Sequence, residues 1–329
     1  MSCLNSFAAK LVLTYFLTFA CIASAEIRPV PVTIGVYIND VQKIDLKNHH
    51  FTADIYIWFR WKAAQINPAE SFEYTNPSEL WGHSTKANYP KPVLLPNGEL
   101  YQVVRTHGQF SQKFLLDQYP FDHQVLMLGI EDSVDESRKI EFILDENPVS
   151  INPLLRLPGF VIGAPKINVE KYSYPTNFGD SRLLGKNSDF SRVVVRLGIH
   201  RPLVPYATKF LLPILCVMFA AALMFLFSPN YVDSRVGIGI TALLTIVALQ
   251  ITLNEDLPEI DYLVLIDKIY LSGYLFVISG LGLVVKTTWM IEKDPEALLA
   301  ASQLSRRGLL VLTLVYIASV LYFVLPVLA

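Results

Sequence analysis

Four long, uncharged apolar runs near the end of the chain constrain its fold more than any other feature. They occupy residues 210–227, 236–254, 269–285 and 308–329. Each is close to the length that an α-helix needs to cross about 30 Å of hydrocarbon at about 1.5 Å per residue. A soluble protein would have too little polar surface to cover four such helices. The sequence therefore predicts four transmembrane helices, at about 206–227, 233–254, 263–285 and 307–328.

Residues 26–200 have the composition of an ordinary globular domain, although the whole chain is 52% hydrophobic. Short segments in which apolar and polar residues alternate are separated by turn sequences such as Asn76-Pro77 and Pro96-Asn97-Gly98. Such alternation is typical of strands with one buried face, and many short strands favour an antiparallel β-sandwich. The predicted strands are 30–38, 51–61, 99–109, 124–130, 140–144, 169–174 and 191–199.

The first 25 residues have the features of a secretory signal peptide. Lys10 precedes the apolar stretch 11–22, and Ala23-Ser24-Ala25 resembles a cleavage site. The alternative is a retained membrane anchor, for which the apolar stretch is short. Under either interpretation residues 26–200 are exported, and residues 201–329 form the membrane domain. Of the three cysteines, Cys3 and Cys21 lie in the predicted signal peptide and Cys216 lies in an apolar run of the membrane domain. The exported domain must therefore fold without a disulfide.

The charges of the connections predict the orientation in the membrane. If residues 26–200 are outside, the 286–307 connection is cytoplasmic and the 255–261 connection is external. The cytoplasmic connection contains Lys286, Lys293, Arg306 and Arg307. The external one contains Glu255, Asp256, Glu259 and Asp261 and no Lys or Arg. This distribution obeys the positive-inside rule.

Several functional classes are disfavoured by the sequence. A net charge of −2 gives no basic field for nucleic acid. A membrane-tethered periplasmic enzyme is the alternative from another class, but the sequence has no nucleophile motif and no zinc-ligand spacing. A transporter would be expected to have an internal repeat or a charged residue at the membrane midplane. No cofactor or metal is predicted.

Three motifs, in order along the chain, resemble those of pentameric ligand-gated ion channels, the Cys-loop receptor superfamily. Tyr-Pro-Phe-Asp at residues 119–122 resembles the signature turn at the base of their sandwich. Arg201-Pro202-Leu203, followed by Pro213, resembles the entry to their first span. Residues 233–241, with Leu257-Pro258 beyond them, resemble their pore-lining second span and its outer linker.

The resemblance implies a bacterial member of this family. Gln112 and Leu126 stand where animal members carry the cysteines of the disulfide-closed loop. Bacterial members lack that bridge and have a short inner connection. The family's architecture implies a homopentamer around a central pore, in which each chain assembles with four identical subunits. We expect it in a Gram-negative inner membrane with the sensor domain in the periplasm.

The second span is expected to line the pore with one face, which recurs about every 3.6 residues. Starting from Asp233, that face contains Gly237, Thr241, Leu244, Ala248, Ile251 and Glu255. Five copies would place carboxylate rings at both mouths and apolar rings between them. Apolar rings can gate by dewetting, so we predict gates at Leu244 and Ile251.

The acidic rings predict selectivity for monovalent cations, with Asp233 as the selectivity residue. Arg235 has the opposite sign, and it resembles a basic residue that usually points away from the lumen in this family. An anion-selective channel of the same family is the alternative. Asp233 is also suited to be an exposed helix N-cap, and the two roles are compatible.

The resemblance places Asp45, Asp122 and Arg201 at the junction between sensor and pore. One arginine shared by two carboxylates would be a charge-assisted clamp that transmits movement. Ordinary surface ion pairs are the alternative.

The family's ligand site lies between subunits under a hairpin, which corresponds here to residues 178–190. Phe178 and Phe190 flank its tip, and Glu131 and Asp132 follow the signature turn. Aromatic rings with carboxylates suit an amine-like agonist. Trp81-Gly82-His83 departs from the family's pattern, so the contribution of that loop is open. Protons are the rival stimulus, sensed by acids such as Asp40 or by His49, His83, His107, His123 and His200.

Overall fold

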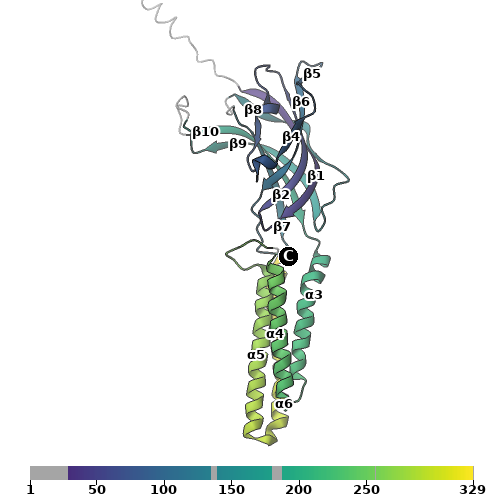
Figure 1. The fold of residues 1–329 in the computed structure, drawn as a ribbon, viewed down its shortest axis with the longest axis vertical. Coiled ribbons are helices and arrows are strands. Elements are labelled where there is room, and N and C mark those ends of the chain that lie inside the picture. The colour runs from purple at the N-terminus through teal and green to yellow at the C-terminus, as the bar shows by residue number, and fades with distance from the viewer. Residues whose placement is uncertain (1–28, 135–138, 180–186, 256, 329) are drawn as a thin grey trace, which may run out of the picture.

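The computed structural model describes residues 29–134, 139–179, 187–255 and 257–328. The predicted signal peptide lies outside these residues. Two parts follow each other along the long axis of the molecule: a β-sandwich, and below it a set of long, roughly parallel helices (Figure 1). The last strand of the sandwich ends at His200 and the first long helix begins at Leu203.

The first sheet has the strand order β4-β6-β2-β1-β8, with β5 paired to β6. Most neighbours are antiparallel, but β1 and β8 run parallel. The predicted antiparallel sandwich is therefore wrong for this one pair. The strands are β1 (Val30–Asp45), β2 (His50–Trp61), β4 (Ser84–Ala87), β5 (Val93–Leu94), β6 (Leu100–Ser111) and β8 (Ile140–Ile151).

The second sheet has the order β3-β7-β10-β9, and its pairs are antiparallel. Its long members β9 and β10 form the hairpin that extends sideways from the sandwich (Figure 1). The strands are β3 (Phe72–Tyr74), β7 (His123–Asp132), β9 (Val161–Tyr174) and β10 (Ser188–His200). The short helices α2 (Pro68–Ser71) and η1 (Leu80–Gly82) lie in the connections between strands.

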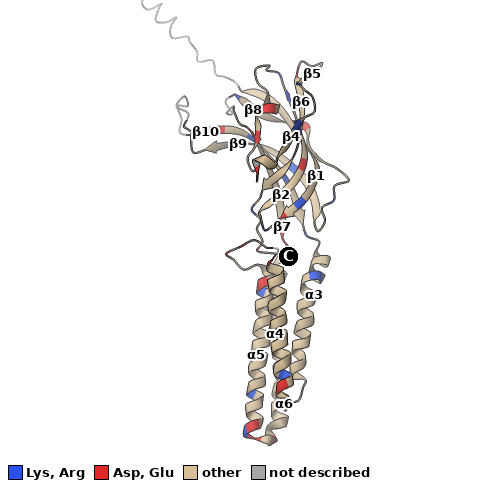
Figure 2. Cartoon of the chain, in the orientation of Figure 1, with Lys and Arg blue, Asp and Glu red and all other residues tan. Residues whose placement is uncertain are grey.

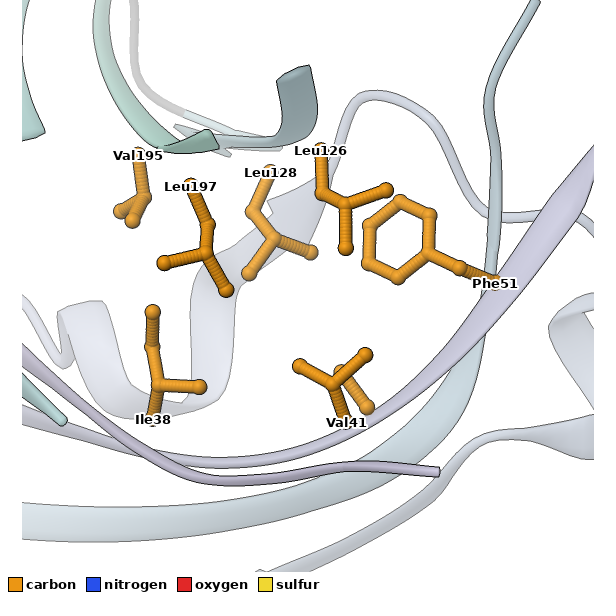
Figure 3. A pocket seen from close by; sticks show the side chains of 8 residues that line it. Ile38, Val41, Phe51, Leu126, Leu128, Val195 and Leu197 are labelled. Atoms are coloured by element: carbon orange, nitrogen blue, oxygen red, sulfur yellow. The ribbon is translucent and has the colours of Figure 1, made fainter. Parts of the chain in front are cut away.

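Alternate residues of the central strands build the core between the sheets. On β2, every second residue from Phe51 to Trp61 is buried. The same alternation on β7 and β10 buries Leu126, Leu128, Val195 and Leu197. Figure 3 shows these side chains, with Ile38, Val41 and Phe51, around a small apolar cavity between the two sheets. This core fixes the register of β7 and β10, which carry the candidate site on their other face.

Four helices are long and apolar enough to cross a membrane, as predicted. Figure 2 shows their charged residues near the two ends, with uncharged middles. The helices are α3 (Leu203–Ala222), continued by η2 (Leu223–Phe225), then α4 (Val232–Asn254), α5 (Leu265–Lys293) and α6 (Leu298–Leu328).

The inner ends of α5 and α6 extend well beyond the predicted spans. The 286–307 segment, expected as a connection, is mostly helical, and Asp294 with η3 (Pro295–Ala297) is all that separates the two helices. Hydropathy marks the part of a helix that matches hydrocarbon, whereas backbone hydrogen bonds continue into the polar region. The predicted end of α5 and the predicted start of α6 therefore lie inside the observed helices.

Candidate functional site

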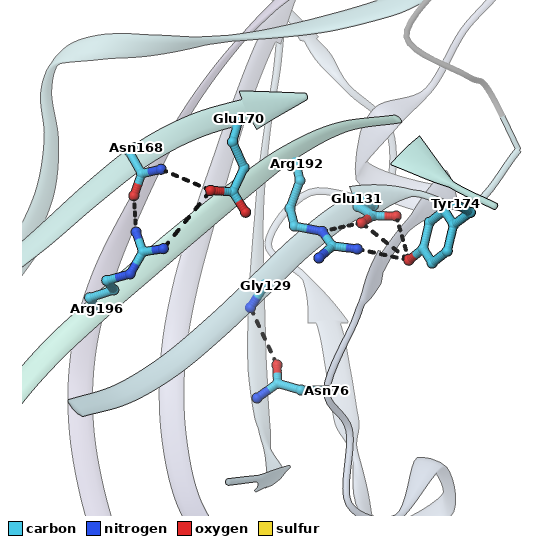
Figure 4. A network of polar contacts seen from close by, with 8 residues as sticks. All are labelled: Asn76, Gly129, Glu131, Asn168, Glu170, Tyr174, Arg192 and Arg196. Carbon is cyan, nitrogen blue, oxygen red and sulfur yellow. Dashed lines mark hydrogen bonds and ion pairs between the residues drawn. The ribbon is translucent and has the colours of Figure 1, made fainter. Parts of the chain in front are cut away.

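The β9–β10 hairpin covers a compact network centred on Glu131 of β7. Arg192 of β10 forms an ion pair with Glu131, and its other arm donates to the hydroxyl of Tyr174 on β9, with 2.8 Å between N and O. The Tyr174 hydroxyl donates in turn to the Glu131 carboxylate, at 3.2 Å (Figure 4). The register explains this meeting, because Val193 and Ile130 are Cα partners and the next residues face each other.

Aromatic rings surround the guanidinium of Arg192. Its central carbon lies 3.4 Å from the centroid of the Tyr172 ring. The ring of Tyr174 packs edge-on against Phe178 at 5.4 Å and against Phe190 at 5.7 Å. Phe178 is 65% exposed at the hairpin tip. The network is thus an aromatic cage that holds a cation of its own chain.

Asp132 does not belong to this cage. It is buried, and it accepts hydrogen bonds from the hydroxyl of Ser71 and from the amide of Val134, at 3.0 Å for the latter. Adjacent residues of a strand point to opposite faces, so Glu131 and Asp132 diverge. The structure therefore brings Glu131, Phe178 and Phe190 together around Tyr174 and leaves Asp132 to organise the neighbouring loop.

The charge of Glu131 also acts on its surroundings. Glu73 of β3 is its Cα partner across the strands, and burial together with the charges of Glu131 and Asp132 raises the pKa of Glu73. Burial and then Glu131 raise the pKa of Tyr174. Both shifts favour the protonated forms of Glu73 and Tyr174, and the Tyr174 hydroxyl is one of the donors to the Glu131 carboxylate.

Three functional candidates were missed from the sequence: Tyr172, Tyr174 and Arg192. The available signal was the period of the strands, because Tyr172 and Tyr174 share one face of β9 and Phe190 and Arg192 share one face of β10. Knowing that these faces coincide requires the β9–β10 register, which depends on long-range pairing.

At the base of the sandwich, Arg201 forms a nearly solvent-free ion pair with Asp122. Its Nε lies 2.9 Å from the Asp122 carboxylate, and the side chains are 7% and 2% exposed. Arg201 also donates to the hydroxyl of Tyr206 at 3.0 Å. Its guanidinium lies 4.6 Å from the Phe160 ring centroid and 5.0 Å from that of Tyr119. The guanidinium is thus held by one carboxylate and several rings.

Asp45 does not join the predicted cluster with Asp122 and Arg201, because its carboxylate binds residues near its own turn. It binds Lys43 at 2.9 Å and the amide of Asn48 at 3.0 Å within the β1–β2 turn. Burial acts to raise its pKa, but the hydrogen bonds from Lys43 and Asn48 prevail and lower it to about 2. In the described part of the chain no ion pair joins Asp45 to Arg201. Local partners in the turn satisfy the carboxylate instead.

A further contact between the two parts was not predicted. The loop before Asp122 caps the start of α5: the amide of Leu265 donates to Asp117 O at 2.9 Å, and that of Ile266 donates to Tyr119 O at 3.3 Å. The first amides of a helix have no partner within the helix, so this loop satisfies them. The signature turn is therefore attached to both α3, through Arg201 and Tyr206, and α5.

The α4 helix has one face packed in its own bundle and a broad free face. Its buried residues include Arg235, Gly239, Ala242 and Ile246. The predicted pore positions are exposed on the single subunit: Asp233, Gly237, Thr241, Leu244, Ala248, Ile251 and Glu255. Asp233 lies in the first turn, where the helix dipole favours a carboxylate, but Tyr231 occupies the N-cap position. The N-cap interpretation of Asp233 is therefore wrong.

Arg235 is fully buried among the inner ends of the helices. It donates to Met224 O in η2 at 2.8 Å, to Thr287 of α5 at 3.0 Å and to Ser305 of α6 at 2.8 Å. The single guanidinium thus joins α4 to three neighbouring elements. It points away from the free face on which Asp233 lies.

Two known channel proteins are similar to the chain over most of its length. It is 22% identical over 294 residues to a proton-gated ion channel of Gloeobacter violaceus, covering 85% of this chain and 79% of that one. It is 21% identical over 276 residues to the theta subunit of the mouse gamma-aminobutyric acid receptor, covering 77% of this chain and 41% of that one. The chain thus spans about two fifths of the mouse subunit.

No protein-family model matches the chain. However, the two relatives, the sandwich and the four apolar helices agree with one another and with the motifs. The chain is therefore similar, in sequence and in architecture, to the pentameric ligand-gated ion channels of the Cys-loop receptor superfamily.

Proposed function

We propose that the chain is the subunit of a homopentameric, cation-selective channel whose pore is lined by α4. The observation that carries this proposal is the free face of α4, which presents Asp233 at one end and Glu255 at the other, while Arg235 is buried in the bundle. Five copies would form two carboxylate rings, and such rings attract cations. The expected location is the inner membrane, with the sandwich in the periplasm.

The test of selectivity is the reversal potential of the purified, reconstituted channel in a NaCl gradient. We expect it to approach the sodium equilibrium potential. A shift toward the chloride equilibrium potential would establish the anion-selective alternative. The mass of the detergent-solubilised particle tests assembly, since a monomer or dimer contradicts a five-subunit pore.

The proposed gate is the apolar part of the same face. Leu244 is 64% exposed and Ile251 is 59% exposed on the single subunit, so both are available to narrow a pore. Replacing Leu244 by Ser should wet the constriction and produce leak current or greater sensitivity to the stimulus. If Ile251→Ser has this effect and Leu244→Ser does not, the barrier lies higher in the pore.

The proposed stimulus acts at the β9–β10 hairpin and is an amine-like agonist or protons. The cage of Tyr172, Tyr174 and Glu131 already binds a guanidinium, which supports a preference for cations. An amine from solution would have to compete with Arg192 for Glu131. Protons would instead act on the carboxylates, among which Glu73 has a raised pKa. Current recorded during pH steps and during application of primary amines at constant pH separates the two.

The proposed coupling path runs through Asp122 and Arg201. The ion pair joins β7 to the start of α3, and the loop before Asp122 caps α5. Movement of β7 can therefore reach two helices of the membrane domain directly. Asp45 contributes to the adjacent β1–β2 turn, whose Lys47 reaches Glu255 O at the end of α4 at 3.3 Å.

A further inference from the structure

Two histidines at the base of the sandwich are directly opposite each other on neighbouring strands. His123 is the first residue of β7 and His200 is the last residue of β10, and they are Cα partners in the antiparallel register. Their rings stack with centroids 5.5 Å apart and planes 23° apart. His123 is exposed and His200 is half-buried, so ions in solution can reach the pair.

In the described part of the chain, the ring nitrogens of both histidines have no hydrogen-bond partner. Within the residues that the structure describes, neither ring makes a hydrogen bond or an ion pair, and each has the other as its aromatic contact. The other histidine that packs on aromatic rings differs in this respect, since His83 bonds Gln109 O at 2.7 Å. The packing of the core does not require the pair either, because both side chains lie on the outer side of their sheet.

We propose that His123 and His200 form a binding site for a divalent transition-metal ion such as Zn²⁺. Neutral imidazole is a preferred ligand for such ions, with metal–nitrogen distances of about 2.0–2.1 Å. A tetrahedral ion then needs its two nitrogens roughly 3.3 Å apart. Nitrogens turned toward each other reach that separation from the observed ring spacing through rotation about χ2, which is a soft torsion in histidine.

The site is open and therefore reversible. The described residues contain no group of three or more His, Cys, Asp or Glu side chains suited to one metal. Two imidazoles would hold the ion, and water would complete its coordination. Structural zinc sites use four protein ligands, so this site should bind more weakly, in a range suited to sensing rather than to permanent occupancy.

The position gives the site a role at the junction. Asp122 precedes His123 and Arg201 follows His200, so the ion pair and the histidine pair are consecutive links between the same two strands. A bridging metal would hold the ends of β7 and β10 together and thereby restrain the separation of Asp122 from Arg201. This inference rests on the sandwich geometry and is independent of which ion the pore conducts.

The test is calorimetric titration of the purified, full-length channel with ZnCl₂, together with its thermal midpoint. We expect one Zn²⁺ per subunit and a raised midpoint, because an ion that binds the folded state stabilises it. His123→Ala and His200→Ala should each lower the affinity at least tenfold and abolish the thermal shift. His107→Ala, which removes an exposed histidine from β6, should leave both unchanged, and MgCl₂ should give no shift.

The proposal is overturned if the double alanine variant binds Zn²⁺ as the unchanged protein does, or if His107→Ala weakens binding equally. If the alanine variants do not fold, a double cysteine variant, which keeps a metal-binding side chain at both positions, tests the site instead. His123→Cys combined with His200→Cys should bind Cd²⁺ more tightly than the unchanged protein, because thiolates prefer softer ions. Absence of Cd²⁺ binding by this folded variant would also overturn the site.

Discussion

Arg201 and Asp122 form an ion pair at the place where the two parts of the molecule meet. Both side chains are almost completely withdrawn from solvent. Removing one partner of such a pair leaves an uncompensated buried charge, at a cost of about 3–5 kcal/mol. The pair therefore has one strongly favoured arrangement, in contrast with the more exposed contact between Lys43 and Asp45.

Replacing Arg201 by Ala should abolish stimulus-evoked current while the channel still reaches the membrane. The carboxylate of Asp122 would retain Gln124 as a donor but lose its cation. Current and surface labelling measured on the same cells check this outcome. Arg156→Ala is the control, because within the described residues this exposed arginine donates only to Pro153 O and Leu155 O of its own turn. Normal gating in Arg201→Gln would show that charge is not what the junction needs.

Replacing Arg192 by Gln should lower the thermal midpoint of the channel by about 5–10 °C, because the buried Glu131 loses its cation. If the stimulus is an amine, the same variant should respond to lower amine concentrations, since the competing guanidinium is gone. Thermal unfolding with and without a primary amine, and dose–response curves, measure both effects.

Arg196→Gln is the matched control for this change. Arg196 lies on the same face of β10 and binds Asn168 and Glu170, away from the cage (Figure 4). It should leave amine sensitivity unchanged. Unchanged or reduced amine sensitivity in Arg192→Gln would contradict the competition between the amine and Arg192 for Glu131.

The residues of the cage mark the limit of what the sequence could predict. Glu131, Phe178 and Phe190 were proposed as ligand contacts through the resemblance, and their meeting around Tyr174 follows from the strand register. Arg192 could not be assigned, because a charged residue on an outward strand face is usually solvated. The predicted contact between Asp45 and Arg201 was wrong for a related reason. The β1–β2 turn does approach the membrane helices through Lys47, but short-range hydrogen bonds from Lys43 and Asn48 determine where the Asp45 carboxylate points.

At the scale of elements, the membrane helices were predicted far better than their ends. Apolar runs locate α3 to α6 because hydrocarbon requires them. The inner extensions of α5 and α6 carry Lys286, Arg306 and Arg307, which read as a connection in sequence and are helical in the structure. The parallel pairing of β1 with β8 could not be predicted either. The alternation of apolar and polar residues shows that one face of a strand is buried, but it does not show the direction of the neighbouring strand.

Arg235 is expected to hold the inner end of the helix bundle together. Arg235→Gln removes up to three hydrogen bonds and should destabilise the subunit by about 2–3 kcal/mol. Arg235→Lys should rescue stability in part, because an ammonium cannot reproduce the fork that reaches Met224, Thr287 and Ser305. Thermal unfolding in detergent checks both. Arg306→Gln, which removes an exposed cation next to Ser305 on α6, is the control, and an equal loss there would contradict the assignment.

The whole molecule makes sense when five subunits share the faces that one subunit leaves open. In the single chain, 22% of the most apolar stretch of α4 and 6% of that of α6 are buried. Lipid can cover such apolar surface, but Asp233 and Glu255 at the ends of the α4 face need water or ions. The proposed central aqueous pore would meet both the need of the apolar surface for lipid or protein and the need of the carboxylates for water, and it would give a single carboxylate per chain a collective effect.

The carboxylate of Asp233 should therefore determine the sign of the permeant ion. In the proposed pentamer, five carboxylates at the inner mouth would lie in a confined setting, where their potentials would add and salt would screen them less than on an open surface. Arg235 does not oppose them, because it is buried toward the other side of α4. Asp233→Asn should lower cation conductance and weaken selectivity, whereas Glu255→Gln at the opposite mouth should reduce conductance with little change in sign. Reversal potentials in a NaCl dilution gradient measure both variants, and an unchanged potential in Asp233→Asn would show that selectivity is set elsewhere along the pore.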